Sequence, residues 1–274
     1  MGRIVVSVKT VASNLNYLTN MRYISGRIVE YDIKAANISV LRDRDIISEA
    51  DYIMLSSMPK NIREREVGLM ELRNPTLYDK IKEGIKDAKE SFVSFNRIDD
   101  KQILRVANDA VYVNTPNDLK YTKLGKYIEF KPKSTFNSFL NINGTIVLVQ
   151  FMPDGNIHAD VKGIGKNSEL HKNFMVYAIV SSIVMLERSS IEDAISYISD
   201  LCEKYLRREL SIEYYREFTP ESLYRARYTG YNGMQYGMTI AKDQDRDNID
   251  ISYNYNILRE VWSILLEIYT MRRQ

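Results

Sequence analysis

The sequence predicts an α+β fold, with an antiparallel sheet and helices in the first part of the chain and a mainly helical lobe in the second. Runs rich in β-branched and aromatic residues, separated by turn signals, continue to about residue 161. Beyond residue 170, apolar residues recur at helical spacing. We therefore expect a sheet-containing domain at residues 1–165 and a helical lobe at residues 166–274.

The composition is that of a soluble globular protein. The chain has 274 residues, 45% hydrophobic and 27% charged, which is enough to bury a core without disulfides. The single cysteine, Cys202, excludes a disulfide framework within the chain and fits a reducing compartment. No apolar run approaches the roughly 18 residues of a membrane span, and the first residues lack the apolar region of a signal peptide. We expect a cytoplasmic protein with no membrane partner.

The net charge of +2 means that any nucleic-acid surface must be local. The 20 tyrosines are the most unusual feature of the composition. Aromatic rings interleaved with Lys and Arg can stack bases while the cations hold phosphates. The alternative is that an AT-rich coding genome favours Tyr, Ile, Lys and Asn together.

The first elements are two strands. A short strand is predicted at residues 4–8, and the partial alternation from Arg27 to Ile33 predicts a strand that ends near Asp32. The Asp32 carboxylate would then lie where the strand ends. An aspartate at this position can equally be a turn former or a helix cap.

A helix is expected to begin after Ser56-Ser57-Met58-Pro59, because serine can cap free N–H groups and proline suits the first helical position. Lys60 and Arg63 are three residues apart and would share one face of it. The alternative for this charged run is a solvated helix face.

The next helix opens at Asn74-Pro75 and has a core-facing stripe formed by Leu77, Ile81, Ile85, Ala88 and Phe92. A hairpin follows, with strands at residues 103–107 and 110–113 joined by Asn108-Asp109. Asp109 would be displayed at the hairpin tip.

Further turn signals at Asn143-Gly144 and Asp154-Gly155 predict an antiparallel meander through about residue 161. A largely buried helix then covers residues 170–186. Ser189-Ser190 caps a second helix that runs to about Leu206, and a third helix spans residues 257–271. The segment from 214 to 256 is irregular.

The segments around Asp32, Lys60 and Asp109 resemble, in this order, motifs A, B and C of family B DNA polymerases, especially short viral ones. The first looks like Asp-x-x-Ser-Leu-Tyr-Pro-Ser, the second like Lys-x-x-x-Asn-Ser-x-Tyr-Gly, and the third like the second half of Asp-Thr-Asp-Ser-Val-Phe. The corresponding residues here are Asp32-Ile33-Lys34-Ala35-Ala36-Asn37-Ile38-Ser39, Lys60 with Gly68, and Asn108-Asp109-Ala110-Val111-Tyr112. The resemblance covers residues 27 to 115 and implies a polymerase palm followed by a thumb-like lobe.

The resemblance also implies roles for individual residues. Asp32 and Asp109 would be the catalytic carboxylates and would hold two Mg²⁺ (or Mn²⁺) ions. Lys60 and Arg63 would bind the incoming nucleoside triphosphate. Asn37 replaces the family's tyrosine that blocks a ribose 2′-hydroxyl, which implies tolerance of ribonucleotides. The implied partners are a DNA or RNA primer-template, nucleoside triphosphates and replication proteins, in the host cytoplasm if the chain is viral.

Other cations follow the hairpin. The family has a Lys-x-Tyr element after motif C that contacts the primer, and the candidates for its counterpart include Lys126-Tyr127 and Lys131. Arg225 and Arg227 are placed like a thumb that grips the nucleic-acid backbone. The alternative for this last segment is that its tyrosines pack a helix bundle and its arginines lie on the surface.

Ala107 stands where the family usually carries another acidic residue, so one motif C carboxylate remains. Three functions stay open. The chain is a DNA polymerase-like nucleotidyltransferase, a catalytically degenerate palm that serves as a nucleic-acid-binding or subunit-assembly module, or a structural α+β protein without a nucleic-acid role.

Overall fold

The computed structural model describes residues 4–9, 22–142, 145–162 and 172–210, with individual helical positions between 258 and 269. The chain divides into two compact units. The first, unit 1, combines Met1–Ser25 with Ser138–Gln274, and the second, unit 2, is the continuous segment Gly26–Asn137. The predicted division at residue 165 into a palm-like and a thumb-like lobe remains a prediction.

Unit 2 contains a sheet in the order β5-β2-β4-β3, in which β4 pairs antiparallel with both β2 and β3. Its strands are β2 (Arg22–Ile33), β3 (Ile103–Val106), β4 (Ala110–Asn114) and β5 (Phe130–Ile142), of which β2 and β5 continue into unit 1 along the chain. The Ala107 N–H donates to the Ala110 carbonyl at 2.8 Å and closes the turn between β3 and β4. The predicted hairpin is therefore confirmed.

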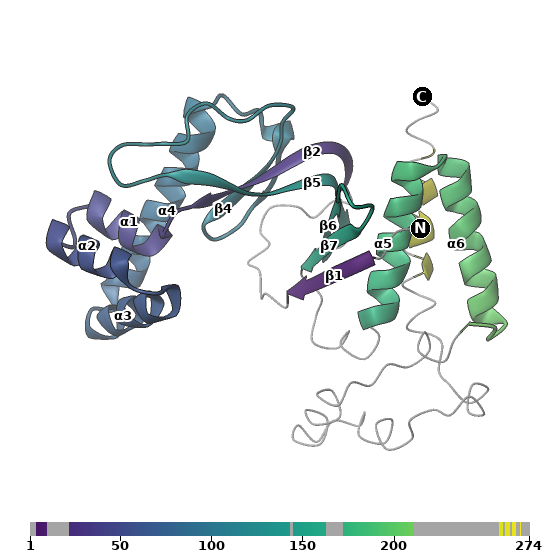
Figure 1. Ribbon diagram of the computed structural model, residues 1–274, viewed down its shortest axis with the longest axis horizontal. Coiled ribbons are helices and arrows are strands. Elements are labelled where there is room, and N and C mark those ends of the chain that lie inside the picture. Colours follow the sequence, from purple (N-terminus) through teal and green to yellow (C-terminus); the bar gives the residue numbers. More distant parts are fainter. Residues whose placement is uncertain are drawn as a thin grey trace, which may run out of the picture. The chain divides into compact units, whose positions relative to one another are not determined.

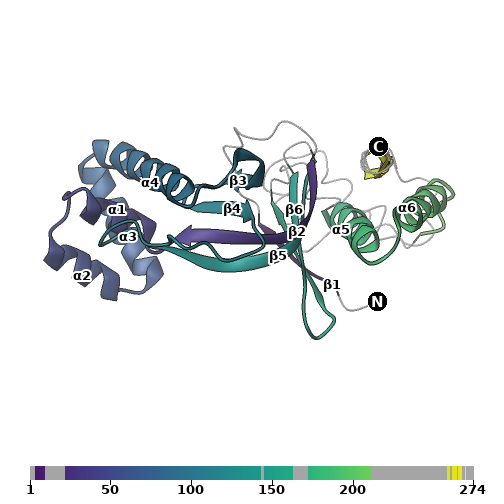
Figure 2. The same ribbon diagram turned by 90° about the horizontal axis from the view of Figure 1, so that it is seen from above.

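The helices of unit 2 follow β2 along the chain (Figure 1). They are α1 (Ala36–Asp43), α2 (Glu49–Ser57), α3 (Lys60–Arg73) and α4 (Thr76–Phe95), followed by a short 3₁₀ helix η1 (Asp100–Gln102). Figure 2 shows α4 running beside strands β2 and β4. The whole predicted stripe of α4 is buried in the unit's core, where the Phe92 ring stacks on Phe130 at 4.0 Å between centroids.

The sequence reasoning did not predict α1 and α2. The prediction that Ser56 and Ser57 cap α3 is wrong, because the N-cap residue is Pro59, which forms no side-chain cap. Ser57 instead closes α2, where its hydroxyl donates to the Met54 carbonyl at 2.7 Å. The start of α3 at Lys60 nevertheless agrees with the expectation.

In unit 1 the sheet order is β1-β7-β6-β5. The elements are β1 (Ile4–Lys9), β6 (Thr145–Phe151), β7 (Ile157–Lys162), α5 (Lys172–Arg188) and α6 (Ile191–Leu206). All pairings in this order are antiparallel except that β1 lies parallel to β7. The predicted cap of α6 is confirmed, because Ser190 and Asp193 form a reciprocal capping box.

The core of unit 1 joins the apolar faces of β6, β7, α5 and α6 with Leu258, Val261 and Leu265 from the expected last helix. The Asn143-Gly144 turn and the irregular segment 214–256 lie outside the described residues. The architecture is α+β, as predicted. Within the described part of the chain, no helix is both long and apolar enough to cross a membrane.

Candidate functional site

A cavity of about 400 Å³ in unit 2 is lined by the end of β2, the first turns of α1 and α3, the β3–β4 turn and part of β5. It brings together most of the predicted site residues. Those that line it are Asp32, Asn37, Lys60, Arg63, Asp109 and Lys131. The same wall also contains Lys34, Glu64 and Lys133, so cations outnumber carboxylates around the cavity.

Asp32 and Asp109 meet because their strands are neighbours. Asp32 of β2 pairs with Ala110 of β4, and the Ile33 N–H donates to the Asp109 carbonyl at 2.9 Å. Along β2 the side chains alternate between faces. Tyr31 and Ile33 pack in the core with α4, which leaves Asp32 on the other face of the sheet.

Lys133 of β5 contacts Asp32 directly. Its Nζ lies 3.1 Å from Asp32 Oδ2 and 3.5 Å from Glu30 Oε1, so one ammonium group bridges two carboxylates of β2. Asp32 Oδ1 is buried, and no donor among the described residues forms a hydrogen bond with it. Burial and the nearby charge of Asp109 raise the pKa of Asp32, and the contact with Lys133 opposes this shift without cancelling it.

The donor set can be compared with what a divalent cation requires. Mg²⁺ prefers carboxylate oxygens and retains several waters, so it needs only one or two carboxylates from the protein together with substrate phosphates. Asp32, with its unpartnered Oδ1, and Asp109 fit that requirement. Among the residues that the structure describes, no group of three or more His, Cys, Asp or Glu side chains is placed to hold a metal. The pair therefore suits Mg²⁺ bound with water and phosphate rather than a protein-only cage.

The cationic wall comes from the start of α3. Lys60 is 79% exposed, and its side chain forms a 3.6 Å ion pair with Glu64, one helical turn further on. Exposed pairs of this kind contribute little to stability, so the Lys60 ammonium is available to an anion. Arg63 lines the cavity one turn after the N-cap residue Pro59. An anionic group in the cavity would thus meet two cations on one helix face.

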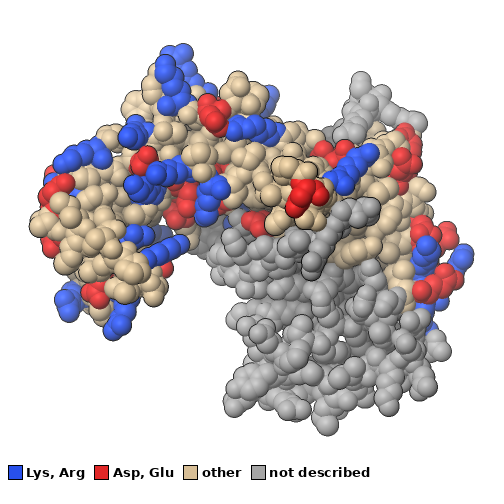
Figure 3. All heavy atoms as spheres, viewed as in Figure 1, with Lys and Arg blue, Asp and Glu red and all other residues tan. Residues whose placement is uncertain are grey.

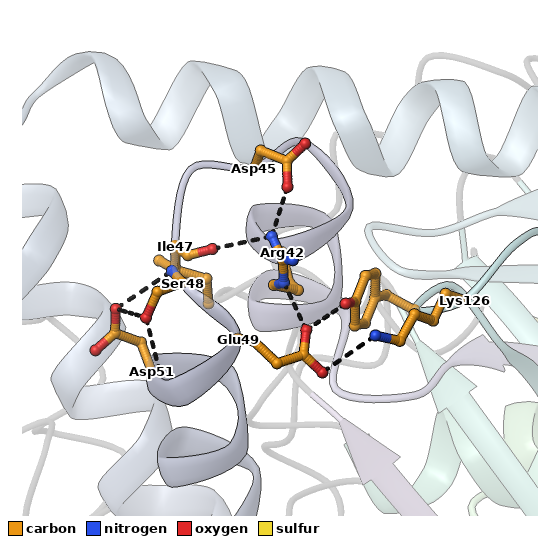
Figure 4. Close-up of polar contacts among 8 residues, drawn as sticks. Arg42, Asp45, Ile47, Ser48, Glu49, Asp51 and Lys126 are labelled. Atoms are coloured by element: carbon orange, nitrogen blue, oxygen red, sulfur yellow. Dashed lines mark hydrogen bonds and ion pairs between the residues drawn. The ribbon is translucent and has the colours of Figure 1, made fainter.

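Lys126 and Tyr127 do not line this cavity. Figure 4 shows Lys126 beside Glu49, the first residue of α2. Glu49 accepts hydrogen bonds from Arg42 Nε at 2.9 Å, from Lys126 Nζ at 3.3 Å and from the Tyr127 hydroxyl. The Arg42 guanidinium also lies 4.9 Å from the centre of the Tyr127 ring. This cluster ties the α1–α2 connection to the segment before β5.

The predicted role of these two residues in nucleic-acid binding stays a prediction. Arg225 and Arg227 lie outside the described residues. The face of the molecule in Figure 3 shows basic and acidic side chains interspersed, in keeping with the small net charge.

Sequence reasoning missed the contact of Lys133 with Asp32 and the proximity of Glu30. The available signal was the spacing of Glu30 and Asp32, since residues two apart on a strand share a face. No local signal indicates Lys133, because it lies 101 residues from Asp32 along the chain.

Fold and site together define an α+β protein whose sheet presents two carboxylates to a cation-lined cavity. The chain belongs to the Bacteriophage PBS1 gene 130 protein family, whose model matches residues 9–267. This membership supports the expected viral connection. No curated protein shows significant similarity to the chain.

Proposed function

We propose that the protein is a metal-dependent nucleotidyltransferase of the DNA polymerase type, which adds nucleotides to a nucleic-acid 3′ end. The observation that carries the proposal is the convergence of Asp32 and Asp109 with Lys60 and Arg63 around one cavity. Phosphoryl transfer depends on positioning and electrostatic stabilisation, and these residue types supply both. The phage family supports a role in the host cytoplasm.

In this proposal Asp32 and Asp109 hold Mg²⁺ or Mn²⁺. Metal held there would supply Lewis-acid activation for the primer 3′-hydroxyl and positive charge for the leaving pyrophosphate. Lys60 and Arg63 bind the triphosphate and stabilise the negative charge that develops on it. Asn37, in the first turn of α1, lines the same cavity. Its side chain is smaller than the tyrosine of the polymerase family and would admit a ribose 2′-hydroxyl. Lys131 extends the cationic wall toward a primer-template.

The test is primer extension with Asp32→Asn and Asp109→Asn in Mg²⁺ and in Mn²⁺. We expect each variant to lose about 10²-fold or more of its incorporation rate, because the metal loses a carboxylate. Asp79→Asn is the matched control, since Asp79 is exposed in the first turn of α4 and does not line the cavity. Undiminished incorporation by both site variants would overturn the proposal.

A second candidate is a degenerate palm that binds nucleic acid without catalysis. The ion pairs of Lys133 with Asp32 and Glu30 favour it, because an ammonium group already occupies part of the space beside these carboxylates that a metal ion would need. Ala107, which carries no acid, agrees with this reading. Strongly salt-dependent binding to primer-template in EDTA, with no incorporation in either metal, would support this candidate over the enzyme.

A further inference from the structure

Lys89 of α4 reaches the turn that carries Asp109. Its Nζ donates hydrogen bonds to two consecutive backbone carbonyls, that of Ala107 at 2.8 Å and that of Asn108 at 3.0 Å. Charge-assisted bonds of this kind are stronger than neutral ones. One ammonium group therefore fixes the two peptide units that precede Asp109.

The other side of this turn is held by β2. The Asp109 carbonyl accepts from the Ile33 N–H at 2.9 Å, and Ala107 pairs with Ala110 across the turn. Lys89 and β2 thus hold the backbone on both sides of Asp109. Without Lys89, the carbonyls of Ala107 and Asn108 would lose a donor that they share.

Helix α4 gives Lys89 a rigid base. Two other residues of α4, Ala88 and Phe92, are buried in the core of unit 2. The Lys89 side chain itself is half-buried, and burial lowers its pKa, although the charges of Asp109 and Glu90 oppose that shift. A buried ammonium group is costly unless it is hydrogen-bonded, and the two carbonyls provide the bonds.

We propose that Lys89 is a positioning residue that fixes the Asp109 carboxylate beside Asp32 by clamping the Ala107 and Asn108 carbonyls. This inference rests on the proposed function, because it assigns Lys89 to the same carboxylate pair. Lys89 does not line the cavity and would touch neither metal nor nucleotide. Its effect passes through the backbone of the turn.

The experiment uses the full chain with Lys89→Met, Lys89→Arg and the control Lys86→Met. Lys86 lies on an exposed part of the same helix, where it pairs only loosely with Glu90 at 3.8 Å. Mn²⁺ affinity is measured by electron paramagnetic resonance. Loss of an outer-shell partner typically weakens metal binding by 10- to 100-fold, so we expect at least a 10-fold loss in K89M, partial recovery in K89R and no change in K86M.

A second readout is independent of metal. Hydrogen–deuterium exchange is followed in peptides covering residues 103–113, with residues 145–151 of β6 as the reference. K89M should exchange faster in the hairpin and unchanged in the reference. If K89M does not fold, Lys89→Gln replaces it in both measurements, because the glutamine side chain is one atom shorter than that of lysine. The expected results are again weaker Mn²⁺ binding and faster exchange in the hairpin.

The two measurements separate the two proposals. If the unmodified protein neither binds Mn²⁺ nor incorporates nucleotides, the proposed function fails, and the exchange rates alone decide whether Lys89 clamps the turn. If the unmodified protein binds Mn²⁺ but the Lys89 variants bind it equally well, the positioning role is overturned while the proposed function stands. Unchanged hairpin exchange in K89M also overturns that role.

Discussion

The ammonium group of Lys133 lies 3.1 Å from Oδ2 of Asp32, and the pKa of that carboxyl is nonetheless raised. Burial is the largest cause of the shift, and the charge of Asp109 adds to it. The Lys133 ammonium group therefore does not cancel the combined effect of burial and the Asp109 charge on the pKa of Asp32. Charge that remains unbalanced in the folded state is what a bound divalent cation would neutralise.

The first prediction concerns the stability that the protein loses when the buried Asp32 carboxyl is ionised. Asp32→Asn should stabilise the protein at pH 7. Because the folded pKa of Asp32 is raised above 3.8, the protonated carboxyl favours the folded state, and its contribution is lost as the pH rises from 3.8 through the folded pKa. The advantage of the variant should thus be absent below pH 3.8 and reach a plateau at neutral pH.

Thermal melts between pH 3 and pH 8 check this outcome. The gain should amount to a few degrees at most, since 1 kcal/mol shifts the melting temperature of a chain of this size by about 2–4 °C. A variant less stable than the unmodified protein at pH 7 would show that the Lys133 ion pair outweighs burial. Greater stability combined with lost incorporation would be the trade-off expected of a functional carboxylate.

The second prediction concerns Glu49 in Figure 4. Hydrogen bonds from Tyr127 and Arg42 lower the pKa of Glu49 from 4.5 to about 2. A lowered folded pKa means that the ionised carboxylate contributes stability above pH 4.5, and that this contribution is lost as the pH falls toward 2. In the Glu49→Gln variant, the free energy of unfolding should therefore fall less steeply as the pH is lowered.

Urea unfolding at pH 7, 5, 4 and 3 measures the difference between Glu49→Gln and the unmodified protein. The difference should be largest at pH 7 and shrink toward pH 3. Glu90→Gln is the control, because Glu90 is an exposed helix residue whose partner Lys86 is 3.8 Å away. A difference that does not change with pH would mean that the cluster acts through packing alone.

The third prediction compares two helix glycines. A Cβ atom on Gly84 of α4 would lie 2.2 Å from Val40 Cγ1 and 2.9 Å from Arg44 Nε, so α1 packs where that side chain would be. Gly84→Ala should destabilise unit 2 by about 1–3 kcal/mol, as overpacking does. At Gly68 of α3, no atom of the described residues lies within 4 Å of such a Cβ apart from the adjacent residues and the helix's own nearby backbone.

Gly68→Ala should therefore stabilise the helix by about 0.5–1 kcal/mol, because alanine loses less entropy than glycine in a helix interior. Urea midpoints of the two variants give the comparison. Equal effects of both substitutions would contradict the close approach of α1 to α4.

A helix or turn can be predicted from the sequence when the residues that determine it lie close together in the chain. The stripe of α4 and the turn at Asn108-Asp109 were predictable, because each rests on residues close together in the chain. Helix α1 was missed, since it begins after Ala35 at φ 49° with no side-chain cap. Helix α2 does carry a capping box at Ser48 and Asp51, but among its residues only Leu55 is buried, so an apolar stripe is lacking.

The same distinction applies to the site. Asp32, Lys60 and Asp109, which the family resemblance groups together, all line one cavity. The bonds that hold them there were beyond the sequence. Lys133 reaches Asp32 only through the pairing of distant strands, and Lys89 reaches the Asp109 turn only because α4 packs against the sheet.

The parallel pairing of β1 with β7 sets the order in which the protein can fold during synthesis. Ile4 pairs with Ile157, so β1 is synthesised well before the strand it pairs with, and all of unit 2 is made between them. Unit 2 is one uninterrupted segment and can complete its own core earlier. Domains generally fold as units while the chain grows. The cavity with Asp32 and Asp109 should therefore form before β1 pairs with β7 in unit 1.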